Sequence, residues 1–286
     1  MAENFEIIHG TLIKYHGSDK VVKIPDNVTE IGEKAFADCK TITNIIIPNE
    51  VIIIGDEAFW SCESLISVSV DNQNKFYADD DGILYNKDFT TLILYPAGRK
   101  AAQFKIPDTV KTIGLAAFGP NNALKVIIIP NSVKRIEYKA FKYCGALTNL
   151  TIPDSVIYIG DEAFKYCKSL ENITLSNNID CIRNAAFKYC ESLKNIIVPD
   201  RVININDDAF KYCGSLRRVV IGNNVKTINS NAFKYCSSLE RIDIPNSVTN
   251  IGGDAFKKCK NLSISGSVNS YAEKFAKQHS FIFVGN

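Results

Sequence analysis

The sequence lacks the usual marks of an enzyme. It contains only three histidines, His9, His16 and His279, and they lie near opposite ends of the chain. The nucleophile pattern GxSxG, the zinc pattern HExxH and the phosphate-binding pattern GxxxxGK are all missing. These absences leave nucleophilic, acid–base and metal catalysis without support. We therefore expect a protein that is not an enzyme and that needs no cofactor.

Strong charge bias and long apolar runs are missing as well. The formal net charge is +2, and 22% of the residues are charged while 46% are hydrophobic. This balance is typical of a soluble folded protein, and it does not indicate a nucleic-acid partner. No apolar run approaches the ~18 residues of a membrane-spanning helix, so no membrane span is expected.

The first residues also lack the features of a secretory signal. Between Met1 and Phe5 there is no basic region followed by a long apolar stretch. This start is compatible with a cytoplasmic protein. It is equally compatible with a chain from which a signal segment has been removed, so the sequence alone leaves both locations open.

What the sequence does contain is one 23-residue unit in nine copies. The pattern is LxxIxIPxxVxxIxxxAFxxC, and Asn121 replaces the Cys of the third copy. The Phe of the Ala-Phe pair occurs at Phe36, Phe59, Phe118, Phe141, Phe164, Phe187, Phe210, Phe233 and Phe256. Every step is 23 residues except the one from Phe59 to Phe118, which is 36 residues longer. Internal repetition of this length predicts a solenoid.

The spacing within a unit predicts how one coil is built. A single coil cannot bury its own apolar face, so stacked coils must place Ile on Ile, Phe on Phe and Cys on Cys. Leu150 and Ile152 both point inward from a strand, and Pro153 ends that strand. Residues 156–160 predict a second strand, and residues 161–167 predict a helical turn. The Phe and Cys of the repeated FKYC are then buried, and its Lys and Tyr are partly exposed.

These residues resemble the 23-residue BspA-type leucine-rich repeat. The resemblance is carried by "IPDSVIYIGDEAFKYCKSL" (152–170) and "IPNSVTNIGGDAFKKCKNL" (244–262). Residues 76–99 look like the hairpin insert of that family, and residues 266–285 are similar to its closing segment. The resemblance implies a right-handed curved solenoid, mostly β with short helical turns, with a parallel sheet on its concave face. It also implies a binding module that is commonly displayed on the cell surface, and it names no catalytic residues.

We predict one domain over residues 1–286. Its parts are an N-terminal cap (1–23), repeats 1–2 (24–70), a hairpin insert (71–105), repeats 3–9 (106–264) and a C-terminal helix–strand cap (265–286). The N-terminal cap is predicted to be a strand pair over the first coil.

The insert and the C-terminal cap each carry local signals. In the insert, residues 83–85 and 91–95 predict strands. In the C-terminal cap, Ser270 to Glu273 fits a capping box. Tyr271 and Phe275 predict the apolar face of a short helix, and residues 281–284 a strand.

Nine cysteines raise the question of disulfide bonds or a metal site. Eight occupy one position of the repeat: Cys39, Cys62, Cys144, Cys167, Cys190, Cys213, Cys236 and Cys259. Parallel side chains on coils about 5 Å apart keep the Cβ atoms beyond the ~3.8 Å of a good disulfide. Zinc would need CxxC pairs or nearby histidines. We therefore expect free buried thiols and no metal, with Cys181 as an additional, more exposed cysteine. The acidic run from Asp79 to Gly82 lacks calcium-loop spacing and predicts a solvated turn.

A basic and aromatic row is one candidate binding surface. Its lysines are Lys142, Lys165, Lys188, Lys211, Lys234 and Lys257, and its tyrosines are Tyr143, Tyr166, Tyr189, Tyr212 and Tyr235. Such a row suits a polyanion such as a glycan. The alternative is a solvated face, because Glu162, Asp208 and Asp254 each precede a lysine by three residues and partly neutralise it. We favour the solvated face.

The outward side of the first strand is the better candidate. One row holds Ile128, Thr151, Thr174, Ile197, Val220 and Asp243, and the row beside it holds Asn149, Asn172, Asn195, Arg218 and Arg241. These positions vary between units while the core positions do not. Exposed β-branched residues are also simply favoured in strands. An exposed apolar row, however, lowers solubility unless a partner covers it.

The prediction is a non-enzymatic binding or adhesion module for a protein or glycoprotein, using the concave strand surface. The resemblance places it at the cell surface or outside the cell, and a monomer is expected. The alternatives are a cytoplasmic scaffold for protein–protein interaction and a polyanion-binding protein that uses the lysine–tyrosine row.

Overall fold

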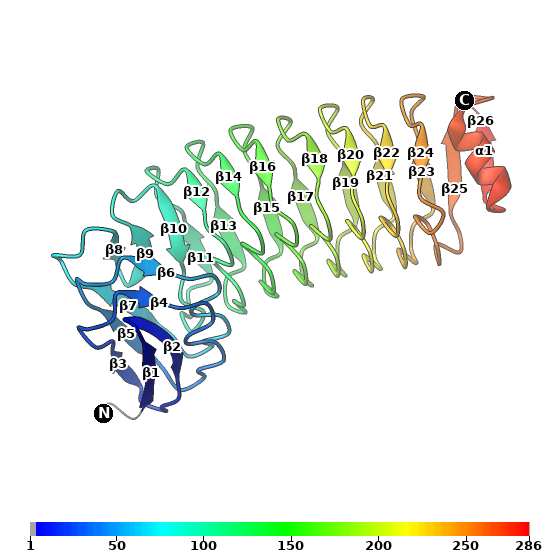
Figure 1. Cartoon of the computed structure of the whole chain (residues 1–286). Coiled ribbons are helices and arrows are strands. Elements are labelled where there is room, and N and C mark those ends of the chain that lie inside the picture. Colours follow the sequence, from blue (N-terminus) through cyan, green and yellow to red (C-terminus); the bar gives the residue numbers. More distant parts are fainter. Residues whose placement is uncertain (1–3, 286) are drawn as a thin grey trace.

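The computed structural model describes residues 4–285 as a β-solenoid of about 12 turns, here called coils (Figure 1). Most coils contribute two short strands, and neighbouring coils stack along the long axis. One helix, α1 (Tyr271–Gln278), lies at the C-terminal end. The predicted leucine-rich-repeat solenoid is confirmed. The division of the chain at residues 24, 71, 106 and 265 stays a prediction.

The first strand of each coil carries the LxxI part of the repeat. These strands form three parallel sheets. The sheets are β3 (Val21–Lys23), β5 (Asn44–Ile47) and β7 (Ser67–Val70); β11 (Gln103–Lys105), β13 (Val126–Ile128), β15 (Asn149–Thr151) and β17 (Asn172–Thr174); and β19 (Asn195–Ile197), β21 (Arg218–Val220), β23 (Arg241–Asp243), β25 (Ser263–Gly266) and β26 (Ile282–Gly285). From β3 to β23, partners in register are 23 residues apart, as Leu150 and Ile173 are, so each core residue lies beside its equivalent.

The second strand precedes the Ala-Phe pair and also forms three sheets. They are β1 (Phe5–Ile8), β2 (Thr11–Tyr15), β4 (Glu30–Ile31) and β6 (Ile53–Ile54); β8 (Tyr77–Asp80), β9 (Ile83–Asn86), β10 (Thr91–Leu94), β12 (Thr112–Ile113), β14 (Arg135–Ile136) and β16 (Tyr158–Ile159); and β18 (Cys181–Ile182), β20 (Asn204–Ile205), β22 (Thr227–Ile228) and β24 (Asn250–Ile251). All pairs are parallel except β1–β2, β8–β9 and β9–β10.

The helical turn expected over residues 161–167 is wrong. The segment is a run of tight turns in which alternate N–H groups bond to the third residue before them, as Cys167 N–H does to Phe164 O (3.1 Å). Glu162 and Tyr166 have φ values of 55° and 64°, in the left-handed region that an α-helix excludes. The physical reason is that backbone N–H groups here bond to the next coil. Phe164 N–H, for example, donates to the backbone carbonyl oxygen of Ala186 in the following unit at 2.8 Å.

These turns hold the coils together where the sheets are interrupted. Within residues 4–285, no ladder joins β16 to β18 or β17 to β19. The coil that contains β17 and β18 lies at both interruptions, and it departs from the repeat. It has Ser176, Ile179 and Arg183 in place of Pro, Val and Gly. The turn bonds nevertheless continue across this boundary, including Tyr166 N–H to Lys188 O at 2.9 Å.

The core is a set of ladders of identical residues. From Phe118 to Phe256 the rings stack with centroids 4.9–5.5 Å apart and planes within 16° of one another. Burying one such ring is worth about 1.5–3 kcal/mol. As predicted, the Phe and Cys of each FKYC are buried, while the Lys and Tyr are half-buried or exposed.

The cysteines form a second ladder beside the phenylalanines. All nine are free, seven are buried, and Cys39 and Cys181 are half-buried. Each of the seven buried thiols donates to the Phe carbonyl of the preceding coil, as Cys167 does to Phe141 at 3.2 Å. Burial raises the pKa of Cys144 to about 12, so the thiol stays protonated and keeps its donor.

Two coils have no Ala-Phe pair and were not recognised as coils from the repeat pattern. In these coils Tyr15 and Tyr95 take the place of Phe. Tyr95 stacks on Phe118 with ring centroids 5.4 Å apart, and Tyr15 packs against Phe36 at 5.5 Å with its ring tilted. Tyr95 belongs to the insert, whose β10 pairs parallel with β12 and so begins the longer array. The predicted insert strands are present as β9 and β10.

The solenoid has two sections, and the first lies at an angle to the longer array (Figure 1). Their cores are separate clusters, one from Leu12 to Leu94 and the other from Ile83 to Ala276. Strands β8 and β9 lie beside β7 and join the sections. The buried Asn74 fixes the start of this hairpin, because its amide donates to Pro48 O and Val51 O at 2.9 and 3.0 Å.

The ends of the solenoid are closed by local structure. At the N-terminus β1 and β2 form the predicted strand pair. At the C-terminus Ser270 caps α1 by accepting from Glu273 N–H at 3.3 Å, as predicted. The predicted apolar face of α1 is partly wrong. Phe275 is buried with Ala272 and Ala276, but Tyr271 is exposed because it lies at the edge of this buried side, in the first turn of the helix.

Candidate functional site

The candidate site is the outward side of strands β13, β15, β17, β19, β21 and β23, here called the strand face. In each strand the middle residue is buried and the first residue is exposed. The third residue is exposed in β13, β15, β17 and β19 and half-buried in β21 and β23. The structure therefore places all eleven predicted residues on the outward side of neighbouring strands, in two rows.

Ile197 is the most exposed apolar residue of this strand face. It is 68% exposed, against 41% for Ile128, while Val220 is half-buried. Two depressions of about 380 and 420 Å³ meet at Ile197. The smaller lies between β17 and β19, where the sheet is interrupted, and the larger extends toward Val220 and Asp243. An exposed apolar side chain between two hollows has the geometry of a protein contact site, which makes Ile197 the centre of the candidate site.

Polar groups surround this apolar centre. Asn172 donates its side-chain amide to Asn149 at 2.9 Å, so part of the asparagine row is pre-ordered. Asp243 accepts from Arg241 at 3.0 Å and from Ser265. Burial alone would raise the pKa of Asp243. Its hydrogen bonds and the positive charges of Arg241 and Arg218 outweigh burial, so the pKa is lowered and the carboxylate is charged at neutral pH.

Three residues next to the strand face were missed by the sequence reasoning. Asn177, Asp200 and Asn223 line the larger depression. Asn223 N–H donates to Asp200 at 2.7 Å, which fixes this border. A sequence signal did exist, because all three residues follow the Pro position of their units. The signal was hidden because only the structure shows that this turn lies beside the strand face.

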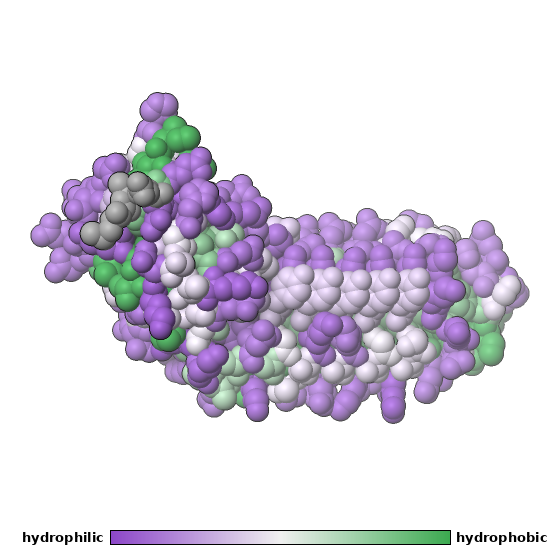
Figure 2. Space-filling view, turned by 90° about the horizontal axis from the view of Figure 1, so that it is seen from below, coloured by the Kyte–Doolittle hydropathy of each residue, from purple (hydrophilic) through white to green (hydrophobic). Residues whose placement is uncertain are grey.

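The lysine–tyrosine row forms a second regular surface. Tyr143, Tyr166, Tyr189, Tyr212 and Tyr235 stack with centroids 4.4–4.6 Å apart and planes within 6° of one another. We call this column the tyrosine ladder. Figure 2 shows a pale row of flat side chains along the longer array, with the form expected of this ladder.

The lysines beside the ladder are held by carboxylates. Glu162 lies between Lys142 (2.6 Å) and Lys165 (2.8 Å), and both lysine side chains are at most 15% exposed. Asp208 and Asp254 each lie between two lysines in the same way. Burial would raise the pKa of Glu162, but the two lysines lower it. Apart from Lys257, whose side chain is 52% exposed, these lysines are mostly buried against carboxylates, which weakens the case for polyanion binding here.

The acidic turn of the hairpin uses its carboxylates within the protein. Asp79 accepts from Val70 N–H at 2.7 Å, and Asp81 pairs with Arg99.

Within residues 4–285 there is no group of three side chains suited to hold a metal ion. His16 pairs with Glu6 at 3.2 Å. His279 stacks on Phe275.

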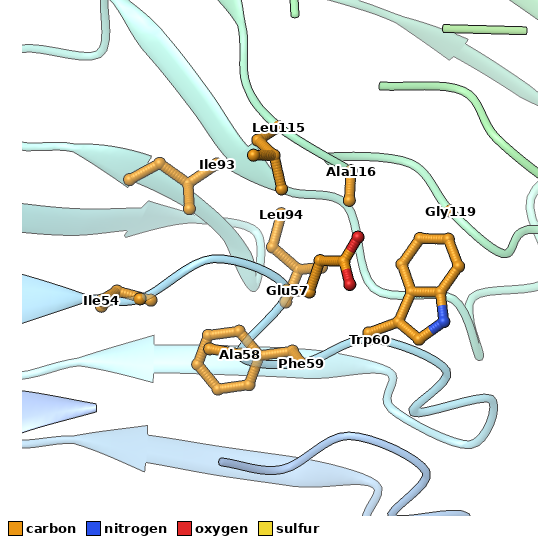
Figure 3. A pocket seen from close by; sticks show the side chains of 11 residues that line it. Ile54, Glu57, Ala58, Phe59, Trp60, Ile93, Leu94, Leu115, Ala116 and Gly119 are labelled. Atoms are coloured by element: carbon orange, nitrogen blue, oxygen red, sulfur yellow. The ribbon is translucent and has the colours of Figure 1, made fainter. Parts of the chain in front are cut away.

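A small cavity of about 40 Å³ lies where the two sections meet (Figure 3). Its lining is mostly apolar, and Figure 3 shows the Glu57 carboxylate pointing between Leu94 and Trp60. Glu57 is 9% exposed and pairs with Lys139 of the longer array. A cavity of this size holds only a few water molecules, so it is a structural joint and not a ligand site.

Stacked coils, ladders of Ile, Phe and Cys, and an exposed strand face define a leucine-rich-repeat solenoid. The model of the BspA-type leucine-rich-repeat region matches residues 8–94, 97–217 and 159–277, with six copies. The chain therefore belongs to the BspA-type leucine-rich-repeat family.

Solved bacterial structures share the fold. A leucine-rich repeat protein from Eubacterium ventriosum is 29% identical with a TM-score of 0.79, over 87% of this chain and 65% of that protein. A leucine-rich cell surface protein from Faecalibacterium prausnitzii is 34% identical with a TM-score of 0.56, over 80% and 52%. This chain therefore spans less than two thirds of either protein. The pneumococcal vaccine antigen PcpA is 22% identical with a TM-score of 0.63, over 95% and 69%, and shows the fold alone.

Two further findings are negative. No curated protein matches this sequence. Within residues 4–285, no helix has the length and apolar character needed to cross a membrane.

Proposed function

We propose that this chain is a non-enzymatic recognition module that binds a protein or glycoprotein through the strand face. The observation that carries the proposal is Ile197, which stands 68% exposed between two depressions. Covering it would remove apolar surface from water, at about 25 cal/mol per Å². Extended solenoid surfaces of this kind are typical binding surfaces.

The polar residues around Ile197 would give the contact its specificity. Asn195 and Thr174 border one depression and Asp200 and Asp243 border the other. Arg218 is exposed and has no ion-pair partner within residues 4–285. An apolar centre with a polar rim is the usual anatomy of a protein interface. A partner that brings an apolar side chain and a carboxylate would fit this arrangement.

We also propose that the module is displayed at the cell surface and acts in adhesion. The Faecalibacterium prausnitzii relative is described as a cell surface protein, and the family of repeats is typically not enzymatic. The competing role is that of an intracellular scaffold for protein–protein interaction.

The test is binding of the chain to immobilised extracellular-matrix proteins. It is run beside a variant that carries Ile128→Lys, Ile197→Lys and Val220→Lys. Three lysines on the strand face should reduce binding at least tenfold, because an ammonium group in a dry contact is strongly unfavourable.

A matched control carries Ile52→Lys, Ile157→Lys and Ile203→Lys. These isoleucines are 40–54% exposed and occupy another row of the repeat. The control should bind like the parent chain. Equal loss in both variants would argue against the strand face, and binding to no matrix protein would argue against adhesion.

A further inference from the structure

A surface pocket of about 440 Å³ lies where the first section meets the tyrosine ladder. Trp60 comes from the first section, while Pro120, Tyr143 and Tyr166 come from the longer array. The rings of Trp60 and Tyr143 meet edge to face, with centroids 6.1 Å apart and planes at 62°. The pocket is therefore an aromatic corner at one end of the ladder, and its volume lies in the range of ligand sites.

Hydrogen-bond donors at this corner are free. Neither the indole N–H of Trp60 nor the hydroxyl of Tyr143 has a protein partner among residues 4–285. The Asn122 side chain also lines the pocket and is exposed. Aromatic side chains with free donors favour a ligand that combines apolar rings with many acceptors. A peptide rich in proline has that chemistry, because its carbonyl groups accept no internal hydrogen bonds.

The ladder repeats with a period that fits such a peptide. Two successive steps, from Tyr143 to Tyr166 and on to Tyr189, measure 4.6 and 4.4 Å between ring centroids. One turn of a polyproline II helix takes three residues and rises about 9.3 Å. Every third residue of the peptide would therefore meet every second tyrosine. The ladder lysines do not oppose such a ligand, since carboxylates already hold them.

One acidic group at the pocket favours a peptide that carries a positive charge. Glu63 lines the pocket and its side chain is 56% exposed. Among residues 4–285 its only ion pair is with Lys40 at 3.9 Å. The other charged residue, Lys168, is paired with Glu191 at 3.1 Å. A carboxylate that is only loosely paired attracts an arginine, which can form two parallel hydrogen bonds with it.

We propose that the junction pocket and the adjoining tyrosine ladder form a dock for a proline-rich segment in the polyproline II conformation. Its prolines pack on Trp60 and along the ladder, and a basic residue pairs with Glu63. This is the mode in which aromatic grooves recognise proline-rich segments in other folds. The dock is separate from the strand face, so its test does not depend on whether the proposed adhesion is correct.

Trp60 provides a direct readout because it is the only tryptophan of the chain. The whole chain is titrated with a peptide of one arginine followed by four prolines, about 16 Å long. The expected result is a saturable blue shift of tryptophan emission with half-saturation below about 1 mM. A control peptide of one arginine followed by alternating glycine and serine should give no shift.

Variants that preserve the fold locate the dock. Tyr143→Phe removes one hydroxyl and Glu63→Gln removes one charge, and each should weaken binding about threefold to tenfold. The matched controls are Tyr235→Phe, at the far end of the ladder, and Glu240→Gln, at an exposed position in another row. Both should leave the affinity unchanged.

Three outcomes would overturn the proposal. One is equal binding of the glycine–serine peptide. Another is equal loss in Tyr143→Phe and Tyr235→Phe. The third is an emission shift with cellohexaose but none with the proline peptide, which would assign the pocket to a neutral oligosaccharide.

Discussion

Each letter of the repeated FKYC has its own structural role. Phe164 stacks in the core, Lys165 is bound by a carboxylate, Tyr166 stacks at the surface and Cys167 donates to a backbone carbonyl. Phe164, Tyr166 and Cys167 each contact the equivalent residue or a backbone group of a neighbouring coil, whereas Lys165 pairs with Glu162 of its own coil. This explains the repetition of the two aromatic letters, because each aromatic ladder is continued only if the next coil carries the same residue.

Removing one carboxylate of the lysine row should destabilise the fold. Glu162→Gln removes two charge-assisted hydrogen bonds from a carboxylate that is 21% exposed. The expected loss is about 1–2 kcal/mol in the free energy of unfolding at pH 7, measured by urea denaturation.

The effect should depend on pH. Folding lowers the pKa of Glu162, so its contribution is present above the usual carboxyl pKa of about 4.3 and is lost as the pH falls through the lowered value. Parent and variant should therefore converge in acid. Glu171→Gln is the control, because its pair with Lys194 is exposed and should contribute less than about 0.5 kcal/mol. Equal losses in both variants would contradict this account.

At the scale of elements, the sequence predicted the strands correctly but did not predict the turns. The strand β15 follows from alternating Leu150 and Ile152 and from Pro153. The segment 161–167 has apolar residues at helical spacing, but its backbone adopts left-handed turns that bond to the next coil. Spacing of side chains along one segment carries no information about a bond to the next coil, so the helical prediction failed there.

The hairpin insert should depend on one buried side chain. Asn74 is fully buried, donates to two carbonyl groups and accepts from the N–H groups of Phe76 and Tyr77, both at 2.8 Å. Asn74→Ala leaves four backbone groups without this partner. We expect a loss of about 2–4 kcal/mol and faster proteolysis within residues 71–90.

The control for this prediction is the neighbouring exposed Asn72. Asn72→Ala should leave both stability and proteolysis unchanged within about 0.5 kcal/mol. Resistance of the Asn74→Ala hairpin to protease would show that packing alone fixes the insert.

At the scale of the molecule, two stacked sections lie at an angle and are joined by the hairpin strands β8 and β9 and by an ion pair. The buried ion pair between Glu57 and Lys139 crosses this joint, beside the cavity lined by Trp60. A partly buried carboxylate that loses its main partner is strongly unfavourable. We therefore expect this contact between residues far apart in the sequence to help hold the two sections at their angle.

Lys139→Met should loosen this joint while leaving the coils intact. Within residues 4–285, Glu57 would then retain only the ion pair with Lys34, at 3.7 Å. We expect amide hydrogen exchange in residues 55–60 to accelerate about tenfold or more, because each 1.4 kcal/mol of lost local stability corresponds to a factor of ten. Hydrogen exchange followed by mass spectrometry measures this directly.

Lys134→Met is the control, since Lys134 is exposed and has no ion pair within residues 4–285. It should exchange like the parent chain. Unchanged exchange in Lys139→Met would show that the hairpin, and not the ion pair, holds the sections together.

The sequence by itself determined the repeat, the core ladders and the residues of the strand face, because a 23-residue period forces equivalent residues to stack. Position in the unit was enough to place Ile197 on the outside and Ile196 in the core. Only the tertiary structure decided which turns border the strand face, where the sheet is interrupted and how Trp60 meets the tyrosine ladder. Those features depend on the joint between the two sections and on contacts between coils, and neither is encoded in the spacing of residues within one unit.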